Sequence, residues 1–128
     1  TADHFRDSVR TVQSLAADAG RTLQPDFAYT SFVYVSMDDN VERARQYAIE
    51  QLTYRFDLPF EKIVDKYCAY GPPSRIVDTI NAYVEAGSNN VVIALVMPPE
   101  ARREWIERFA KNVLPSLKML TVVDPSSV

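Results

Sequence analysis

The chain has 128 residues, of which 47% are hydrophobic and 24% charged, a composition typical of one soluble globular domain. Its 14 basic and 17 acidic residues give a net charge of −3, which argues against binding to nucleic acid or to an anionic membrane. One cysteine excludes an internal disulfide, and with one histidine it argues against a zinc site or other metal centre. No apolar run is long enough to span a bilayer and no signal peptide is recognisable, so we expect a cytoplasmic protein.

The first half of the chain predicts a helix, a strand and a second helix. Apolar residues recur at helical spacing over residues 5–19, and Gly20 is placed to close that helix with a left-handed cap. The chain lacks an initiator Met, so we expect a fragment whose upstream strand is absent. β-branched and aromatic residues over 27–37 predict a strand covered on both faces. The next helix is expected from Val41 to about Tyr54, and its N-cap candidates are Asp38, Asp39 and Asn40.

The second half predicts a short helix, a longer helix, a strand and a last helix. The short helix runs through Tyr67, and the break at 71–73 precedes a helical stripe that ends at Gly87. The continuous apolar run over 91–96 is typical of a parallel strand buried on both faces. A final helix is expected from the prolines at 98–99 to Pro115, with an inner face of Trp105, Ile106, Phe109, Val113 and Leu114.

Two details complete this prediction. Glu104 and Arg108, four residues apart on the wet face of the last helix, are expected to form an ion pair. Residues 119–128 are predicted to be a disordered tail. The whole chain, residues 1–128, is interpreted as a single segment without internal repeats.

Strands that alternate with helices predict a parallel sheet in an α/β fold. Two strands do not make a stable sheet alone, and we therefore interpret the chain as the C-terminal part of a TIM (β/α)8 barrel, with about two strands and their helices. The missing N-terminal barrel portion or a homo-oligomer partner would supply the remaining strands. A small α/β domain of unrelated fold is an alternative, and it requires at least one more strand.

Three stretches resemble the late region of the bacterial-luciferase-like oxidoreductases. The first runs from Ala19-Gly20-Arg21 through Pro25-Asp26-Phe27 and a strand to Asp38-Asp39. The second is Gly71-Pro72-Pro73-Ser74 with the helix that ends in Glu85-Ala86-Gly87. The third is the Phe109–Pro115 segment of the last helix. Ser74 and Asn112 depart from the family pattern, in which acidic residues are usual at both positions.

The resemblance implies a TIM-barrel enzyme that uses FMN or a deazaflavin (coenzyme F-420), an oxidoreductase or monooxygenase acting on a small organic substrate. This chain would contribute the seventh and eighth strands, close the barrel and wall one side of the pocket. The family's cofactor phosphate and most catalytic groups come from earlier strands. No catalytic or cofactor-binding residue is therefore assigned in this chain.

The barrel interpretation places chemistry at the carboxyl ends of the strands. Those positions are Ser36 and Met37 after the first strand, and Val96 and Met97 after the second. They are candidates for the pocket wall, or alternatively residues of the core and turns.

For several other polar and aromatic residues, a structural role is an alternative to a functional one. Asp38 and Asp39 are candidates for acid–base work, but helix capping explains both. His4 lacks a partner at catalytic spacing, and Cys68 is expected to be a small core residue. An aromatic-rich connection could be a substrate lid, pack outside the barrel or form a dimer surface; it contains Tyr47, Tyr54, Phe56, Phe60, Tyr67 and Tyr70.

The sequence thus favours a part of a flavin- or deazaflavin-dependent enzyme. The alternative is a non-catalytic binding or interaction protein, a partial barrel that self-associates through an exposed edge of the 91–96 strand. The substrate, the choice of cofactor and the oligomeric state do not follow from the sequence.

Overall fold

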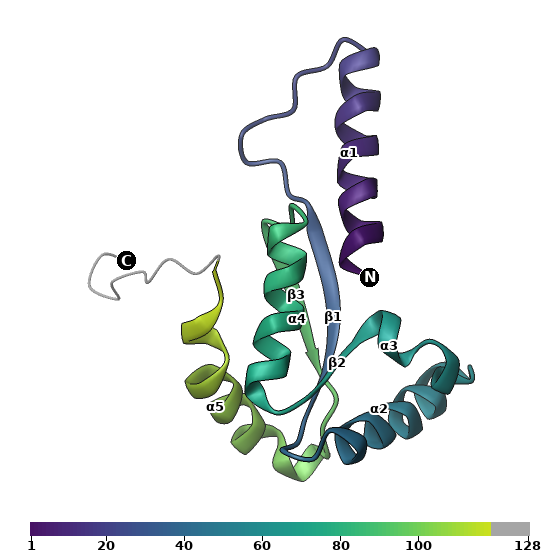
Figure 1. Cartoon of the computed structure of the whole chain (residues 1–128), viewed down its shortest axis with the longest axis vertical. Helices are drawn as coiled ribbons and strands as arrows, with labels where there is room; N and C mark the ends of the chain where they lie inside the picture. The colour runs from purple at the N-terminus through teal and green to yellow at the C-terminus, as the bar shows by residue number, and fades with distance from the viewer. Residues whose placement is uncertain (119–128) are drawn as a thin grey trace.

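The computed structural model describes residues 1–118, so the predicted tail over 119–128 lies outside the described residues. Within them, three parallel strands form one sheet in the order β2-β1-β3 (Figure 1). The strands are β1 (Thr30–Met37), β2 (Cys68–Gly71) and β3 (Asn90–Leu95). The predicted α/β class with parallel strands is confirmed. The helices are α1 (Ala2–Asp18), α2 (Val41–Phe56), α3 (Val64–Tyr67), α4 (Pro73–Glu85) and α5 (Arg102–Asn112), with 3₁₀ turns η1 (Phe60–Lys62), η2 (Pro99–Ala101) and η3 (Leu114–Ser116).

The two predicted strands, β1 and β3, pair directly and in parallel from Thr30 opposite Asn90 to Val35 opposite Leu95. The expected count of about two strands is wrong, because β2 pairs with the other edge of β1 over Tyr34–Met37. Its four residues lie between a one-turn helix and Pro72, which leaves too few positions to show a strand period. This strand also supplies the additional strand that an unrelated α/β domain would require.

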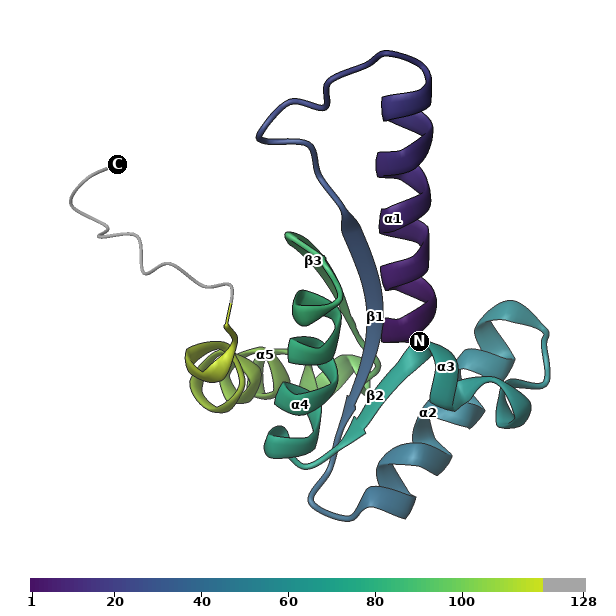
Figure 2. The same cartoon turned by 45° about the horizontal axis from the view of Figure 1, so that its top comes forward.

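Strand β1 is the centre of the fold because helices pack on both of its faces. Its odd-numbered residues, Val33, Val35 and Met37, are buried against α4 and α5. On the opposite face, Tyr34 packs in a second cluster to which α2, η1, α3 and β2 contribute, and Ser36 donates a hydrogen bond to α2. Figure 2 shows α4 and α5 on one side of the strands and α2 with α3 on the other. The core therefore consists of two clusters separated by the sheet.

This arrangement bears on the predicted barrel. In a closed (β/α)8 barrel the helices cover only the outer face of the strands. Here α2 lies on the face opposite α4 and α5, as in open, doubly wound α/β sheets. The structure thus establishes a parallel sheet with helices, and the closed barrel stays a prediction.

The expectation that both strands are covered on both faces is wrong for the amino half of the α2-side face. Phe32 is 53% exposed and Val92, its partner across the pairing, is 41% exposed. The cluster formed with α2 includes Tyr34 and Val96, which lie further toward the carboxyl ends of their strands. Helix α2 therefore covers the carboxyl half of this face and leaves an apolar patch beyond it.

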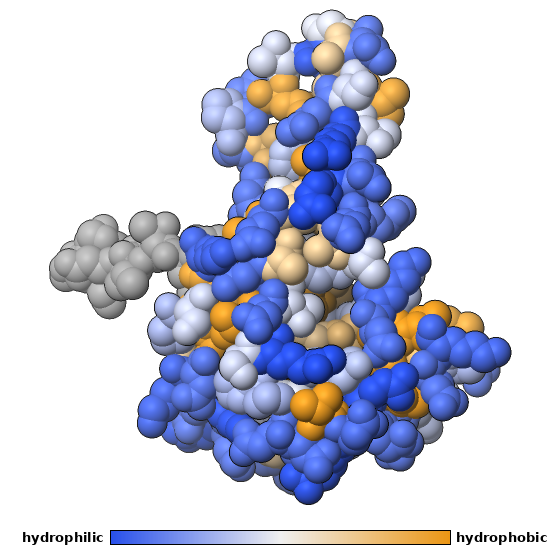
Figure 3. Space-filling view, in the orientation of Figure 1, coloured by the Kyte–Doolittle hydropathy of each residue, from blue (hydrophilic) through white to orange (hydrophobic). Residues whose placement is uncertain are grey.

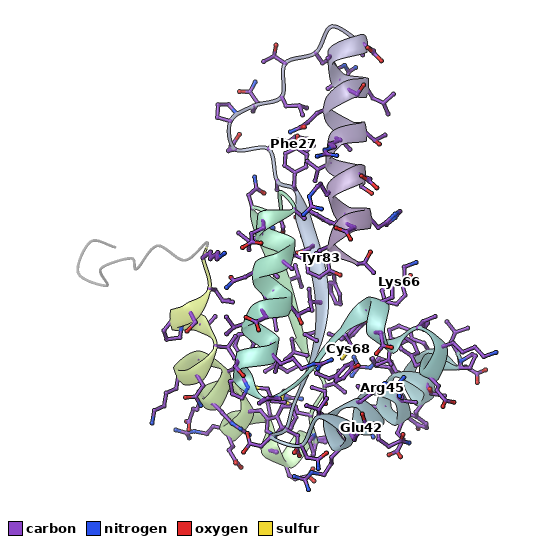
Figure 4. All side chains as sticks on the ribbon, viewed as in Figure 1. Phe27, Glu42, Arg45, Lys66, Cys68 and Tyr83 are labelled. Atoms are coloured by element: carbon purple, nitrogen blue, oxygen red, sulfur yellow. The ribbon has the colours of Figure 1, made fainter. Side chains whose placement is uncertain are left out.

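Helix α1 packs mainly on α4 and on the turn that follows it. The ring of Phe5 meets that of Tyr83 (labelled in Figure 4) edge-on, with the ring centroids 5.9 Å apart. Val9 lies so close to Gly87 that a Cβ atom at position 87 would contact its side chain. Gly20 has a φ of 66°, which confirms the predicted left-handed cap. The far half of α1 and the segment after it project beyond the sheet, and Figure 3 shows apolar colour on this arm and near the end of α2.

The last helix ends earlier than predicted, at Asn112, and η3 continues the chain past Pro115. Ile106, expected on its inner face, is exposed, whereas Phe109 and Val113 are buried. Residues 105 and 109 are four positions apart and therefore share the helix face that packs on the core. Residue 106 is rotated away from that face around the helix axis, so its side chain points outward. Among residues 1–118, none of the helices combines the length and apolarity that crossing a membrane requires.

The packing of α2 on the sheet predicts unequal effects for one substitution at two positions. Leu52 is completely buried in the α2-side cluster, and Leu15 on α1 is 62% exposed. We expect Leu52→Ala to lower the free energy of unfolding by about 2–5 kcal/mol and Leu15→Ala by less than about 1 kcal/mol. Urea unfolding of the two variants measures the difference, and equal losses would contradict the placement of α2.

The burial of Cys68 predicts an unreactive thiol. The side chain is 7% exposed beside α2, and burial raises its pKa to about 12 (Figure 4). The thiolate is the reactive form, so we expect very slow reaction with Ellman's reagent at pH 8 and rapid reaction of one thiol in denaturant. Rapid stoichiometric labelling of the folded chain would show that the α2-side cluster does not shield this residue.

Candidate functional site

A cavity of about 200 Å³ lies at the carboxyl ends of β1 and β3. It is bounded by the end of β1, the first turns of α2, the loop after β3 and one residue of α5. These elements meet because parallel strands all end at the same edge of the sheet. The lining residues are Ser36, Met37, Asp38, Arg43, Ala44, Tyr47, Pro98 and Trp105.

The topology explains why a hollow forms at this position. The chain leaves β1 toward α2 on one face of the sheet, and it leaves β3 toward α5 on the other face. Two neighbouring strands whose connections diverge in this way leave a crevice outside their carboxyl ends, where ligands of open α/β sheets commonly bind. The cavity is therefore a consequence of strand order as well as of side-chain size.

The floor of the cavity is apolar and rigidly held. Met37 is buried in the core, and the side chains of Tyr47, Pro98 and Trp105 are partly buried around it. Ser36 is buried too, and its hydroxyl donates a 2.9 Å hydrogen bond to the carbonyl oxygen of Ala44. That bond ties α2 to β1 and commits the hydroxyl proton, so Ser36 acts as a structural link.

The rim carries one carboxylate and one guanidinium, and they pair with each other. Arg43 donates two hydrogen bonds of 2.7 Å to Asp38, one from Nε and one from Nη2. Asp38 also accepts a bond from the backbone N–H of Asn40. Asn40 is the N-cap of α2, accepting from the backbone N–H of Arg43, so one of the three predicted cap candidates is confirmed. The Arg43 hydrogen bonds hold the pKa of the Asp38 carboxyl below its usual value.

Asp39 pairs with an arginine of the last helix. Arg108 on α5 donates a 2.7 Å hydrogen bond to Asp39, which ties the last helix to the β1–α2 loop. The expected pair of Glu104 with Arg108 is therefore wrong in this structure, because the tertiary partner takes the guanidinium. Asp38 and Asp39 each have their own arginine, so the two carboxylates do not form an acid–base pair.

Of the four predicted wall residues, the structure brings two to the cavity. Ser36 and Met37 line it. Val96 is buried in the α2-side cluster, and its backbone N–H donates to the Val35 carbonyl oxygen at 2.8 Å, which extends the β1–β3 pairing. Val96 and Met97 are not among the lining residues. A role of any of the four toward a ligand stays a prediction.

Sequence reasoning missed Tyr47 and Trp105 as lining residues. Trp105 was assigned to the core, and Tyr47 to an aromatic group of open function. The signal available was position: Tyr47 lies in the second turn of the helix after β1, and Trp105 near the start of the helix after β3. Such helix starts surround the carboxyl end of a parallel sheet. Burial, with Glu100 as a second cause, raises the pKa of the Tyr47 hydroxyl.

The remaining candidates lie elsewhere. His4 is exposed on the first turn of α1, in a hollow that also includes Lys66 and Tyr83. Of the aromatic group, Tyr47 alone lines the cavity; Phe56, Phe60 and Tyr67 border a separate apolar hollow beside Tyr34. In residues 1–118 there is no cluster of three His, Cys, Asp or Glu side chains that could hold a metal ion.

Comparison with known proteins supports the fold and not the family. No family model matches the chain, and no curated protein matches it in sequence. Among solved structures, a Type II Baeyer-Villiger monooxygenase is similar, with a TM-score of 0.59 and 18% sequence identity. It is the oxygenating constituent of 3,6-diketocamphane monooxygenase from the CAM plasmid of Pseudomonas putida, in complex with FMN. The match covers 95% of this chain and 42% of that protein.

At this identity the likeness is one of fold. It supports the predicted parallel α/β architecture, and this chain spans about two fifths of the length of the protein that it matches. The luciferase-like family, for which no sequence match exists, stays a prediction.

The described residues do not by themselves fit a whole flavin. The cavity of about 200 Å³ accommodates a small ring, whereas a flavin has fused rings, a ribityl chain and a phosphate group. Near the cavity, the guanidiniums that could bind a phosphate, those of Arg43 and Arg108, are both paired with carboxylates. A flavin would therefore need residues beyond those of this site.

The ion pair between Arg43 and Asp38 predicts that the pKa of the Asp38 carboxyl depends on Arg43. Because the folded-state pKa of Asp38 is depressed, its pairing stabilises the fold above the unfolded pKa of about 3.9, and that stability is lost as pH falls through the lower folded pKa. We expect Arg43→Gln to raise the pKa of Asp38 toward its ordinary value in a carboxyl NMR titration. Arg103→Gln, which removes an exposed arginine that pairs with Glu107, is the control and should leave it unchanged.

Proposed function

We propose that this chain is part of a flavin- or deazaflavin-dependent oxidoreductase that acts as a monooxygenase on a small organic substrate. In the proposed enzyme these residues close a TIM barrel and form one wall of the substrate pocket. The cofactor, FMN or a deazaflavin, is held mainly by residues that this chain does not contain. The observation that carries the proposal is the cavity at the carboxyl ends of two adjacent parallel strands, in a fold similar to part of an FMN monooxygenase.

The geometry supports a role for this chain in forming the substrate pocket rather than in binding the cofactor. The two longest strands, β1 and β3, lie side by side and in parallel, as neighbouring strands of a barrel do. Because β2 pairs with the other edge of β1, further strands would join the sheet at β2 and β3. Because Arg43 and Arg108 are paired with carboxylates, residues 1–118 present no free arginine at the cavity for a phosphate group. An apolar cavity whose rim charges pair with each other suits the part of an oxidoreductase site that positions the substrate and excludes water. The cofactor would supply the redox chemistry when bound.

The proposed barrel also gives the exposed face of the sheet a role. Phe32 and Val92 lie exposed beyond α2 on one face. Burying apolar surface of this kind drives association with further structure. In the proposal, the missing N-terminal barrel portion packs on this face.

The same observation supports a second candidate function, a non-catalytic interaction protein. A partial barrel whose exposed apolar face and strand edges are covered by copies of itself would bury Phe32 and Val92 without any upstream chain. The two candidates differ in mass and in cofactor. A self-associating protein would keep the 14.5 kDa subunit and would bind no flavin.

Two measurements on the protein as its own cell produces it test the proposal. A barrel typically needs about 250 residues, so we expect a denatured intact mass of about twice 14.5 kDa or more. We also expect the visible absorption of a bound flavin or deazaflavin, either as purified or after addition of the cofactor. A subunit of 14.5 kDa that takes up neither cofactor would overturn the proposal and favour the self-associating alternative.

A further inference from the structure

We propose that the cavity between β1, α2 and α5 binds a small uncharged molecule built on a single ring, and that the Asp38–Arg43 pair at its rim rejects charged analogues. This inference names the substrate class for the site and rests on the proposed function only in treating that cavity as a substrate site. It requires neither the flavin nor further strands, because the cavity is lined by residues of this chain.

The size of the cavity sets the size of the ligand. An enclosed apolar cavity of about 150 Å³ is known to hold benzene. The present cavity of about 200 Å³ is somewhat larger and opens toward solvent, which leaves room for one six-membered ring with a short substituent. A long chain or a fused-ring system would have to extend beyond it.

The walls favour a ring that lacks charge. Met37, Pro98, Tyr47 and Trp105 present sulfur, aliphatic carbon and aromatic surface, which attract a ligand by excluding water and by dispersion. The indole and phenol rings also offer flat surfaces for contact with another ring. A charged ligand would lose hydration on entering such a site and would need a counter-charge to recover it.

The rim supplies no free counter-charge. Both oxygens of the Asp38 carboxylate accept hydrogen bonds from Arg43, at 2.7 Å each. Arg108 on α5 is engaged as well, since it pairs with Asp39 at 2.7 Å. Glu100 lies close enough to Tyr47 to raise the pKa of its hydroxyl, but it is outside the lining of the cavity. An anion that approaches Arg43 meets the Asp38 carboxylate already paired with it, and a cation that approaches Asp38 meets the Arg43 guanidinium. Neither ion finds an unopposed counter-charge at the rim, so an uncharged ligand is preferred.

Trp105 makes the binding measurable. It is the single tryptophan of the chain, and it lines the cavity, so a ligand that enters the cavity should change its fluorescence. The probes are cyclohexanol, cyclohexanecarboxylate and cyclohexylammonium, which share one ring and differ in charge. Titrations use the full chain without flavin, and ligand-observed NMR of the ring protons provides a second readout. We expect cyclohexanol to bind with a Kd about tenfold or more below that of either ion.

Two substitutions at the rim test the charge argument. Arg43→Gln leaves Asp38 without its partner, so cyclohexylammonium should bind roughly two- to fivefold more tightly than to the unaltered chain. Asp38→Asn leaves Arg43 without its carboxylate and should favour cyclohexanecarboxylate by a similar factor, while its amide oxygen can still accept from the Asn40 N–H. Arg103→Gln, on the outer side of α5, is the matched control and should change none of the three affinities.

The outcomes are distinct. Failure of all three probes to bind by both readouts, or equal affinity for the neutral and charged rings, would overturn the inference. So would rim substitutions that alter all three affinities alike. The flavin proposal is judged separately by intact mass and cofactor absorption, and a chain that selects the neutral ring without ever binding flavin would sustain this inference while that proposal fails.

Discussion

The whole structure depends on burying β1 from both sides. Val35 on one face and Ser36 on the other are both inaccessible to solvent, so neither face can be left to water. Helices α4 and α5 cover the first face, and α2 covers the carboxyl half of the second. Because the hydroxyl of Ser36 is buried, it needs a partner, and the carbonyl oxygen of Ala44 supplies it. This bond fixes the start of α2 against the end of β1.

The position of the cavity follows from that constraint. Once α2 is held against one face of β1 while α5 packs on the other, their first turns stand apart at the carboxyl edge of the sheet. Tyr47 and Trp105 point to the space between them from opposite sides. Two ion pairs then fix the rim: one joins the start of α2 to the loop before it, and the other joins that loop to α5. The site is thus a by-product of how the central strand is covered.

An element of this fold could be predicted from the sequence where its pattern of apolar residues is long enough to show a period. Strands β1 and β3 and the long helices follow from apolar patterns of six residues or more, and Gly20 from the backbone geometry that a helix end requires. The four residues of β2 carry no such pattern, because Cys68, Ala69 and Tyr70 fit a helix end equally well. The carboxyl-end rule located Ser36 and Met37. It did not find Trp105, whose place depends on which face α5 packs.

The ion pairs near the cavity could not be predicted from sequence spacing, because one of them joins residues far apart in the chain. Arg108 was expected to pair along its own helix with Glu104, a contact worth only a few tenths of a kcal/mol at a surface. In the folded chain it meets Asp39 across 69 positions of sequence instead. Had both arginines kept partners within their helices, Asp38 would stand free at the rim, with Asp39 free beside it, and the cavity would attract cations. Because folding pairs Asp38 with Arg43 and Asp39 with Arg108, the two carboxylates are neutralised, and in the proposed site the apolar walls select the ligand.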